Sequence, residues 1–113
     1  SDVFNRQVIG QTNTFLIVDV PSPPLNPIIS YFDHTQVSFN WEQPLYNGGQ
    51  AISGFYIFRQ DCSISNSVPA SIATLPPSQF NYIDATVVGG STLCYTIVAY
   101  NILGGNSQPS LML

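Results

Sequence analysis

The side chains that could perform acid–base or metal chemistry are few and widely separated along this chain. No two carboxylates have the spacing of a general acid and its base, and they do not gather into a set of metal ligands. The single histidine, His34, follows Asp33 in a predicted turn and has no nucleophile motif to serve. The sequence therefore predicts a protein that is not an enzyme and has no cofactor or metal. The carboxylates concerned are Asp2, Asp19, Asp33, Glu42, Asp61 and Asp84.

Composition restricts the kind of partner. Of the 113 residues only 7% are charged, against a usual value of about 25%, and the net charge is −4. Arg6 and Arg59 are the only basic side chains besides His34, so the chain cannot follow a nucleic-acid backbone. A surface of neutral polar and aromatic residues suits an extracellular or assembled protein. The apolar run from Phe15 to Val18 is too short to span a membrane.

Short strands explain the whole hydrophobic pattern. In residues 90–101, Leu93, Tyr95, Ile97 and Ala99 share one face of an extended strand, which predicts a central strand of a sheet. No 3.6-residue periodicity appears, and Gly, Pro or Asn turns recur every 10–15 residues, as in an antiparallel sandwich. We therefore expect an all-β fold. Further strands are predicted at 14–20, 25–30, 36–41, 52–60, 70–75 and 79–85, with a last one beginning at 109.

Aromatic, proline and glycine residues recur along these strands at distinctive intervals. Trp41 is followed by Pro44 and by Gly48-Gly49, and the run Asn81-Tyr82-Ile83-Asp84 precedes Gly90. Tyr95, Ile97, Ala99, Asn101, Gly104, Ser107, Pro109 and Ser110 then follow. With this spacing, residues 23–110 resemble a fibronectin type III module, nearly without gaps from Tyr82 to Ser110. The resemblance implies a sandwich of about seven antiparallel strands over residues 21–113, preceded by an N-terminal arm (1–20) with an extension strand.

Two departures from the family pattern affect the expectations. Leu93 occupies the place of the tyrosine whose hydroxyl normally bonds back to the backbone, so we expect packing alone to hold that corner. The last strand is also expected to be short, since the family's strand runs on well past the Pro-Ser pair and only Leu111, Met112 and Leu113 follow Ser110 here. The second departure predicts an open sheet edge beside residues 90–101.

The resemblance also implies a disulfide. In such a sandwich the strands at 52–60 and 90–101 are antiparallel neighbours. We expect Tyr56 to pair with Tyr100 and Phe58 with Val98, which brings Cys62 opposite Cys94. A disulfide there indicates an oxidising, extracellular or cell-surface location. Two unrelated thiols are the alternative.

The N-terminal arm could supply the missing strand. The proposed donor residues are Thr14, Phe15, Leu16, Ile17, Val18, Asp19 and Val20. The proposed acceptor edge consists of Tyr95, Ile97, Ala99, Leu111 and Leu113. The stiff Pro21–Pro24 stretch directs the arm away from its own module, so donation to another copy would build a head-to-tail filament of identical subunits.

Two other interpretations stay open at this stage. In the first, the chain is a spacer or binding module of a larger secreted protein or enzyme, with residues 14–20 left over from a preceding module. Alternatively, the arm folds back onto its own sheet. All three interpretations make the chain a non-enzymatic structural unit.

Overall fold

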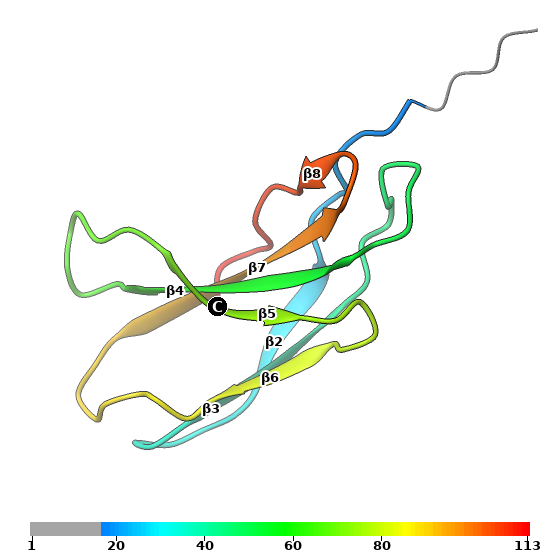
Figure 1. Ribbon diagram of the computed structural model, residues 1–113. Coiled ribbons are helices and arrows are strands. Elements are labelled where there is room, and N and C mark those ends of the chain that lie inside the picture. The colour runs from blue at the N-terminus through cyan, green and yellow to red at the C-terminus, as the bar shows by residue number, and fades with distance from the viewer. Residues whose placement is uncertain (1–16) are drawn as a thin grey trace, which may run out of the picture.

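Residues 17–113, which the computed structural model describes, form two antiparallel sheets packed face to face (Figure 1). The first sheet contains β2 (Leu25–Phe32), β3 (Val37–Glu42) and β6 (Asn81–Asp84), in the order β2-β3-β6. The second contains β5 (Ala70–Leu75), β4 (Gly54–Asp61), β7 (Leu93–Asn101) and β8 (Gly105–Asn106), in the order β5-β4-β7-β8. The seven strands confirm the predicted all-β sandwich. No helix within residues 17–113 has the length and apolar character needed to cross a membrane.

The core lies between the sheets and is largely aromatic. Phe39 and Phe55 are fully buried, and the Phe39 ring lies 4.9 Å from the Tyr95 ring, measured between centroids. Trp41 packs edge-on against Phe55 at 5.6 Å. These are the inward residues that the alternating sequence pattern predicts, since successive side chains of a strand point to opposite faces.

The pairing of β4 with β7 corrects the predicted register. Tyr56 pairs with Val98, and Phe58 pairs with Thr96, two residues away from the predicted partners. The outward parity is unchanged, so the rings of Tyr56 and Tyr100 still stack, diagonally, with centroids 4.5 Å apart. The outward aromatic side chains therefore pack across strands and are half-buried.

The edge of β7 that faces away from β4 is covered by residues 107–113. Leu113 exchanges two backbone hydrogen bonds with Tyr95, of 2.9 and 3.3 Å. The N–H of Ser110 donates to the carbonyl of Ile97 at 2.9 Å. The N–H of Ser107 donates to the carbonyl of Ala99 at 2.7 Å. The open acceptor edge expected at Tyr95, Ile97 and Ala99 is therefore wrong.

Serine hydroxyls explain how so few residues cover this edge. The Ser110 Oγ accepts from the Ile97 N–H at 2.9 Å, and the Ser107 Oγ accepts from the Ala99 N–H at 3.0 Å. Successive contacts advance three residues along the C-terminal segment for every two along β7. Because a regular ladder advances one for one, the segment is not a strand, and the final strand predicted from Pro109 does not form.

Candidate functional site

The segment that leads into β2 packs against two loops at one end of the sandwich, which we call the N-terminal pole. The N–H of Asp19 donates to the carbonyl of Gly48 at 2.8 Å. Three residues later, the N–H of Ser22 donates to the carbonyl of Tyr46 at 2.9 Å. The N–H of Tyr46 donates in return to the Ser22 hydroxyl oxygen at 3.0 Å. Figure 1 shows this segment beside the β3–β4 loop and β8. Asp19 and Ser22 are thus fixed to their own module.

Two glycines form a slot for the Asp19 carbonyl. A Cβ added at Gly48 would lie 2.0 Å from the Asp19 oxygen, and one added at Gly104 would lie 2.1 Å from it. Real Cβ atoms do not approach a backbone atom so closely, so both positions require glycine. Gly48 also has a φ of +87°, which side-chain-bearing residues rarely adopt.

Asn101, the last residue of β7, joins the parts of this site. Its Nδ2 donates to the carbonyl of Asp19 at 2.8 Å and to the carbonyl of Asn47 at 2.9 Å. Its Oδ1 accepts from the N–H of Gly104. Asn101 is only 1% exposed, so these three bonds are made out of water. We call Gly48, Asn101 and Gly104, with the Asp19 carbonyl they hold, the N-terminal clamp.

The loops and the lead-in segment at this pole carry large apolar side chains that remain exposed to solvent. Leu45 is 85% exposed on the β3–β4 loop, and Ile102 and Leu103 are 78% and 65% exposed on the β7–β8 turn. Ile17, just before the clamp, is 79% exposed. This end of the sandwich therefore exposes several large aliphatic side chains to solvent.

The predicted donor strand is only partly within the described residues. Thr14, Phe15 and Leu16 lie outside them. Ile17, Val18, Asp19 and Val20 belong to no strand, and Asp19 is held by the clamp of its own module. Sequence reasoning missed the clamp, although the glycines at 48 and 104 and the asparagine at 101 had all been noted as family-like.

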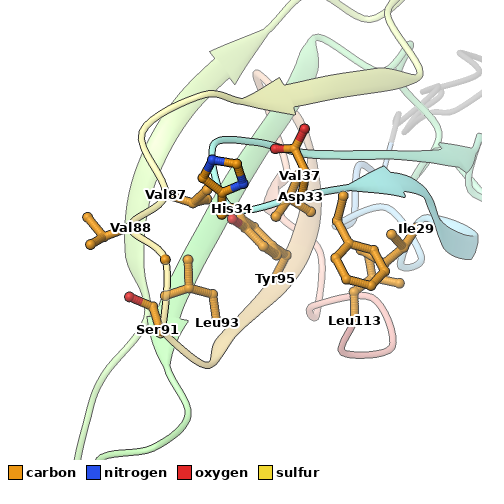
Figure 2. Close-up of a pocket in the computed structure, with 13 residues that line it drawn as sticks. Ile29, Asp33, His34, Val37, Val87, Val88, Ser91, Leu93, Tyr95 and Leu113 are labelled. Atoms are coloured by element: carbon orange, nitrogen blue, oxygen red, sulfur yellow. The ribbon is translucent and has the colours of Figure 1, made fainter.

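A second surface feature lies toward the opposite end of the sandwich. A hollow of about 480 Å³ is bounded by β2, the β2–β3 and β6–β7 loops, the start of β7 and Leu113 (Figure 2). Its apolar lining includes Ile29, Phe32, Val37, Val88, Leu93 and Leu113. We call it the far-pole groove. The Asp33 carboxylate and His34 lie at its rim, and Asp33 is already engaged by Thr35 and by the Tyr31 hydroxyl.

Near this groove, a buried carboxylate replaces the expected corner tyrosine. Asp84 is 1% exposed and accepts from the Tyr95 hydroxyl at 2.6 Å and from Arg59 Nη1 at 2.8 Å. Its other oxygen accepts from the N–H and hydroxyl of Thr86. The expectation that packing alone holds this corner is wrong, because the hydroxyl comes from Tyr95, two residues beyond Leu93.

The pKa values of the two buried groups reflect this network. Burial by itself would raise the pKa of the Asp84 carboxyl, but the hydrogen bonds from Thr86, Tyr95 and Arg59 outweigh it and lower the pKa to about 2. Burial and the bond to Asp84 raise the pKa of the Tyr95 hydroxyl. Asp84 is thus a permanently ionised structural anion at neutral pH, poorly suited to accept a proton in catalysis.

The predicted disulfide is present. Cys62 and Cys94 are bonded, with Cα atoms 6.0 Å apart. The N–H of Cys62 donates to the carbonyl of Thr92, so the two cysteines are diagonal neighbours rather than directly opposite. Among residues 17–113, no group of three or more potential metal-ligating side chains comes together.

Comparisons with known proteins place the fold. No family model matches the chain. It is 32% identical over 94 residues, 78% of its length, to amylopullulanase of Thermoanaerobacterium saccharolyticum. It is 39% identical over 44 residues, 39% of its length, to human slow-type myosin-binding protein C. These matches cover 7% and 4% of the two relatives, so the chain spans only a small part of each.

A solved structure resembles nearly the whole chain. The fibronectin type III domain of human fibronectin type III domain containing protein 3 aligns with a TM-score of 0.68 and 18% identity, over 92% of this chain and 88% of that domain. This chain has a three-stranded sheet with β3 between β2 and β6, and a four-stranded sheet with β7 between β4 and β8. Residues 17–113 form a fibronectin type III-like β-sandwich.

Proposed function

We propose that this chain is a non-enzymatic structural module of a larger secreted or cell-surface protein, and that its N-terminal pole fixes the direction of the chain that enters it. The N-terminal clamp carries this proposal. A carbonyl held between two glycines and bonded by a buried Asn101 cannot act as a free hinge.

Two further observations support a module of a larger protein. The relatives share only 4% and 7% of their length with the chain, as expected when one unit of a long protein is matched. The Cys62–Cys94 disulfide supports an oxidising compartment, where such bonds persist. The module would include Asp19, whose N–H and carbonyl both bond to the sandwich.

Strand donation to the β7 edge is not part of this proposal. Tyr95, Ile97 and Ala99 already bond to Leu113, Ser110 and Ser107 of the same chain. A donated strand would have to displace these bonds and would gain only their equivalents.

The test is to measure the backbone mobility of Asp19 and Val20 by 15N relaxation. We expect order parameters near about 0.85, typical of a rigid backbone. In Gly104→Ala the new Cβ would collide with the Asp19 carbonyl, so these order parameters should fall below about 0.6.

Gly89→Ala is the matched control. A Cβ there would meet only His34, at an ordinary distance of 3.5 Å, far from the clamp. Its order parameters at Asp19 should equal those of the parent chain. If Asp19 were already mobile in the parent chain, or if Gly104→Ala left it rigid, the clamp would not fix the chain direction.

A further inference from the structure

Asn47 lies beside the N-terminal clamp and is the only asparagine of the chain that a glycine follows. The Cγ of an asparagine can be attacked by the backbone nitrogen of the next residue. Attack is easiest before glycine, which has no side chain to hinder the approach. Asn47 is exposed on the β3–β4 loop, so water reaches its amide. The peptide link between Asn47 and Gly48 is therefore a candidate site of covalent modification.

The hydrogen bonds around Asn47 favour this attack. The N–H of Gly49 donates to Asn47 Oδ1 at 2.8 Å. This donor polarises the Cγ carbonyl and would stabilise the negative charge that develops on Oδ1 in a tetrahedral intermediate. Within residues 17–113, neither the Asn47 Nδ2 nor the Gly48 N–H donates a hydrogen bond. The attacking nitrogen and the leaving group are thus both free of partners in the part of the chain that the structure describes.

The reaction needs only water as a co-reactant. The Gly48 nitrogen forms a bond to Asn47 Cγ, the Cγ–Nδ2 bond breaks, and ammonia leaves with the proton of the Gly48 N–H. The product is a cyclic succinimide, to which water adds at one of the two carbonyl carbons. Addition at Cγ breaks the new bond and gives aspartate on the original backbone. Addition at the main-chain carbonyl carbon breaks the original peptide bond and gives isoaspartate, which lengthens the backbone by a methylene group.

Isoaspartate at this position would disturb the clamp. The Asn47 carbonyl accepts from Asn101 Nδ2 at 2.9 Å, and Gly48 lies tightly against the Asp19 carbonyl. In isoaspartate the former main-chain carbonyl becomes a side-chain carboxylate, and the added methylene displaces Gly48 along the chain. The bond of 2.8 Å from the Asp19 N–H to the Gly48 carbonyl is displaced with it. Aspartate leaves the backbone unchanged and keeps these contacts.

We propose that the Asn47–Gly48 link is a site of isoaspartate formation, and that this modification opens the N-terminal clamp. The formation of isoaspartate does not depend on the proposed function of the clamp, whereas the release of Asp19 rests on it. The segment that leads into β2 is then fixed in newly made protein and mobile in aged protein. The modification also adds a negative charge to a chain whose net charge is −4, so the aged forms can be separated by anion exchange.

The first experiment is incubation of the 113-residue chain at mildly alkaline pH, followed by peptide mapping and enzymatic detection of isoaspartate. Asn47 should be converted to isoaspartate and aspartate at least about tenfold faster than Asn66 and Asn106. These two asparagines are also exposed, but serine follows each of them, so they are matched controls within the same molecule.

The second experiment is amide hydrogen exchange at Asp19 in the separated forms. The isoaspartyl form should exchange at least about tenfold faster than the unmodified chain. Freshly prepared Asn47→Asp carries the same added charge on an unchanged backbone, so its exchange at Asp19 should equal that of the parent chain. Asn47→Ser cannot form a succinimide and should keep slow exchange after the same incubation.

Several results would overturn the proposal. One is conversion of Asn47 no faster than that of Asn66 and Asn106. Another is an isoaspartyl form that exchanges at Asp19 like the parent chain, and a third is an Asn47→Asp variant that exchanges as fast as the isoaspartyl form. Fast exchange at Asp19 in the fresh parent chain would refute the clamp and with it the proposed release, whereas failed conversion would refute the modification alone.

Discussion

The hydroxyl of Tyr95 donates a 2.6 Å hydrogen bond to the carboxylate of Asp84, across the interior between β7 and β6. The same carboxylate oxygen receives Arg59 at 2.8 Å. A buried anion with this many donors is stable only as long as the donors remain. The pair therefore connects the two sheets by polar bonds near Leu93, where this chain lacks the usual tyrosine of the family pattern.

Substitution of Asp84 should be costly and should change the acid response. Asp84→Asn should lower the free energy of unfolding by about 2–3 kcal/mol, because Arg59 and Tyr95 lose a charged acceptor. The pKa of Asp84 is lowered from 3.8 to about 2 on folding. Its stabilising contribution is therefore complete above pH 4 or so and is lost as the pH falls toward about 2.

Urea unfolding between neutral pH and about pH 2 measures both effects. The parent chain should lose more stability than Asp84→Asn over the acid range. Some loss should remain in the variant, because hydrogen bonds from Thr35 also lower the pKa of Asp33. Equal acid slopes for the two proteins would show that the Asp84 network does not stabilise the fold.

Removal of the Ser110 hydroxyl should destabilise the pairing of residues 107–113 with β7. Ser110→Ala leaves the Ile97 N–H without its acceptor at a buried site, which should cost about 1–3 kcal/mol. Thermal unfolding of this variant beside Ser78→Ala, an exposed serine, measures the difference. If both variants unfolded at the same temperature, the hydroxyl bond would contribute nothing.

Loss of the Asn101 amide should destabilise the module and release the lead-in segment together. Asn101→Ala removes both bonds from Nδ2 and the bond accepted from Gly104, for about 3 kcal/mol. Amide exchange at Asp19 should then become fast. Asn106→Ala, at an exposed position of β8, is the control and should leave both quantities unchanged. Slow exchange at Asp19 in the Asn101 variant would contradict the role of the clamp.

Opening the disulfide should destabilise the sandwich without rearranging it. The bond closes a loop with a sequence separation of 32, which corresponds to about 3–4 kcal/mol in the chain-entropy treatment. The double variant Cys62→Ala/Cys94→Ala and the reduced parent chain should share one lowered urea midpoint. Unchanged midpoints after reduction would argue against this contribution.

Alternation predicted the sheet faces well but left the register open. A slip of two residues keeps every side chain on its face, so the pattern that identifies Tyr56 and Tyr100 as outward is the same in both registers. Only long-range pairing distinguishes Tyr56 opposite Val98 from Tyr56 opposite Tyr100. The disulfide prediction holds in both registers because Cys62 lies opposite Cys94 in the predicted one and diagonal to it in the observed one.

The missed features share a physical cause. The Ser110 hydroxyl oxygen accepts a hydrogen bond from the backbone N–H of Ile97. The Tyr95 hydroxyl donates a hydrogen bond to Asp84 across the interior between the two sheets. Neither relationship leaves a periodic trace in the sequence. The Asn101 clamp likewise depends on three segments that are distant along the chain. The alternation of apolar residues predicts which face of a strand is buried. These hydrogen bonds depend instead on how segments distant in the sequence are placed in the folded chain.

The three-for-two spacing of residues 107–113 also has a consequence for solubility. A regular edge strand offers a row of evenly spaced donors and acceptors on which further strands of other molecules can assemble. This segment follows β7 irregularly, uses Ser107 and Ser110 hydroxyls in place of carbonyls and includes Pro109, which has no N–H. Its outer side therefore gives aggregating chains a poor template. In a protein with so few charges to keep molecules apart, the irregular last segment resists uncontrolled sheet growth.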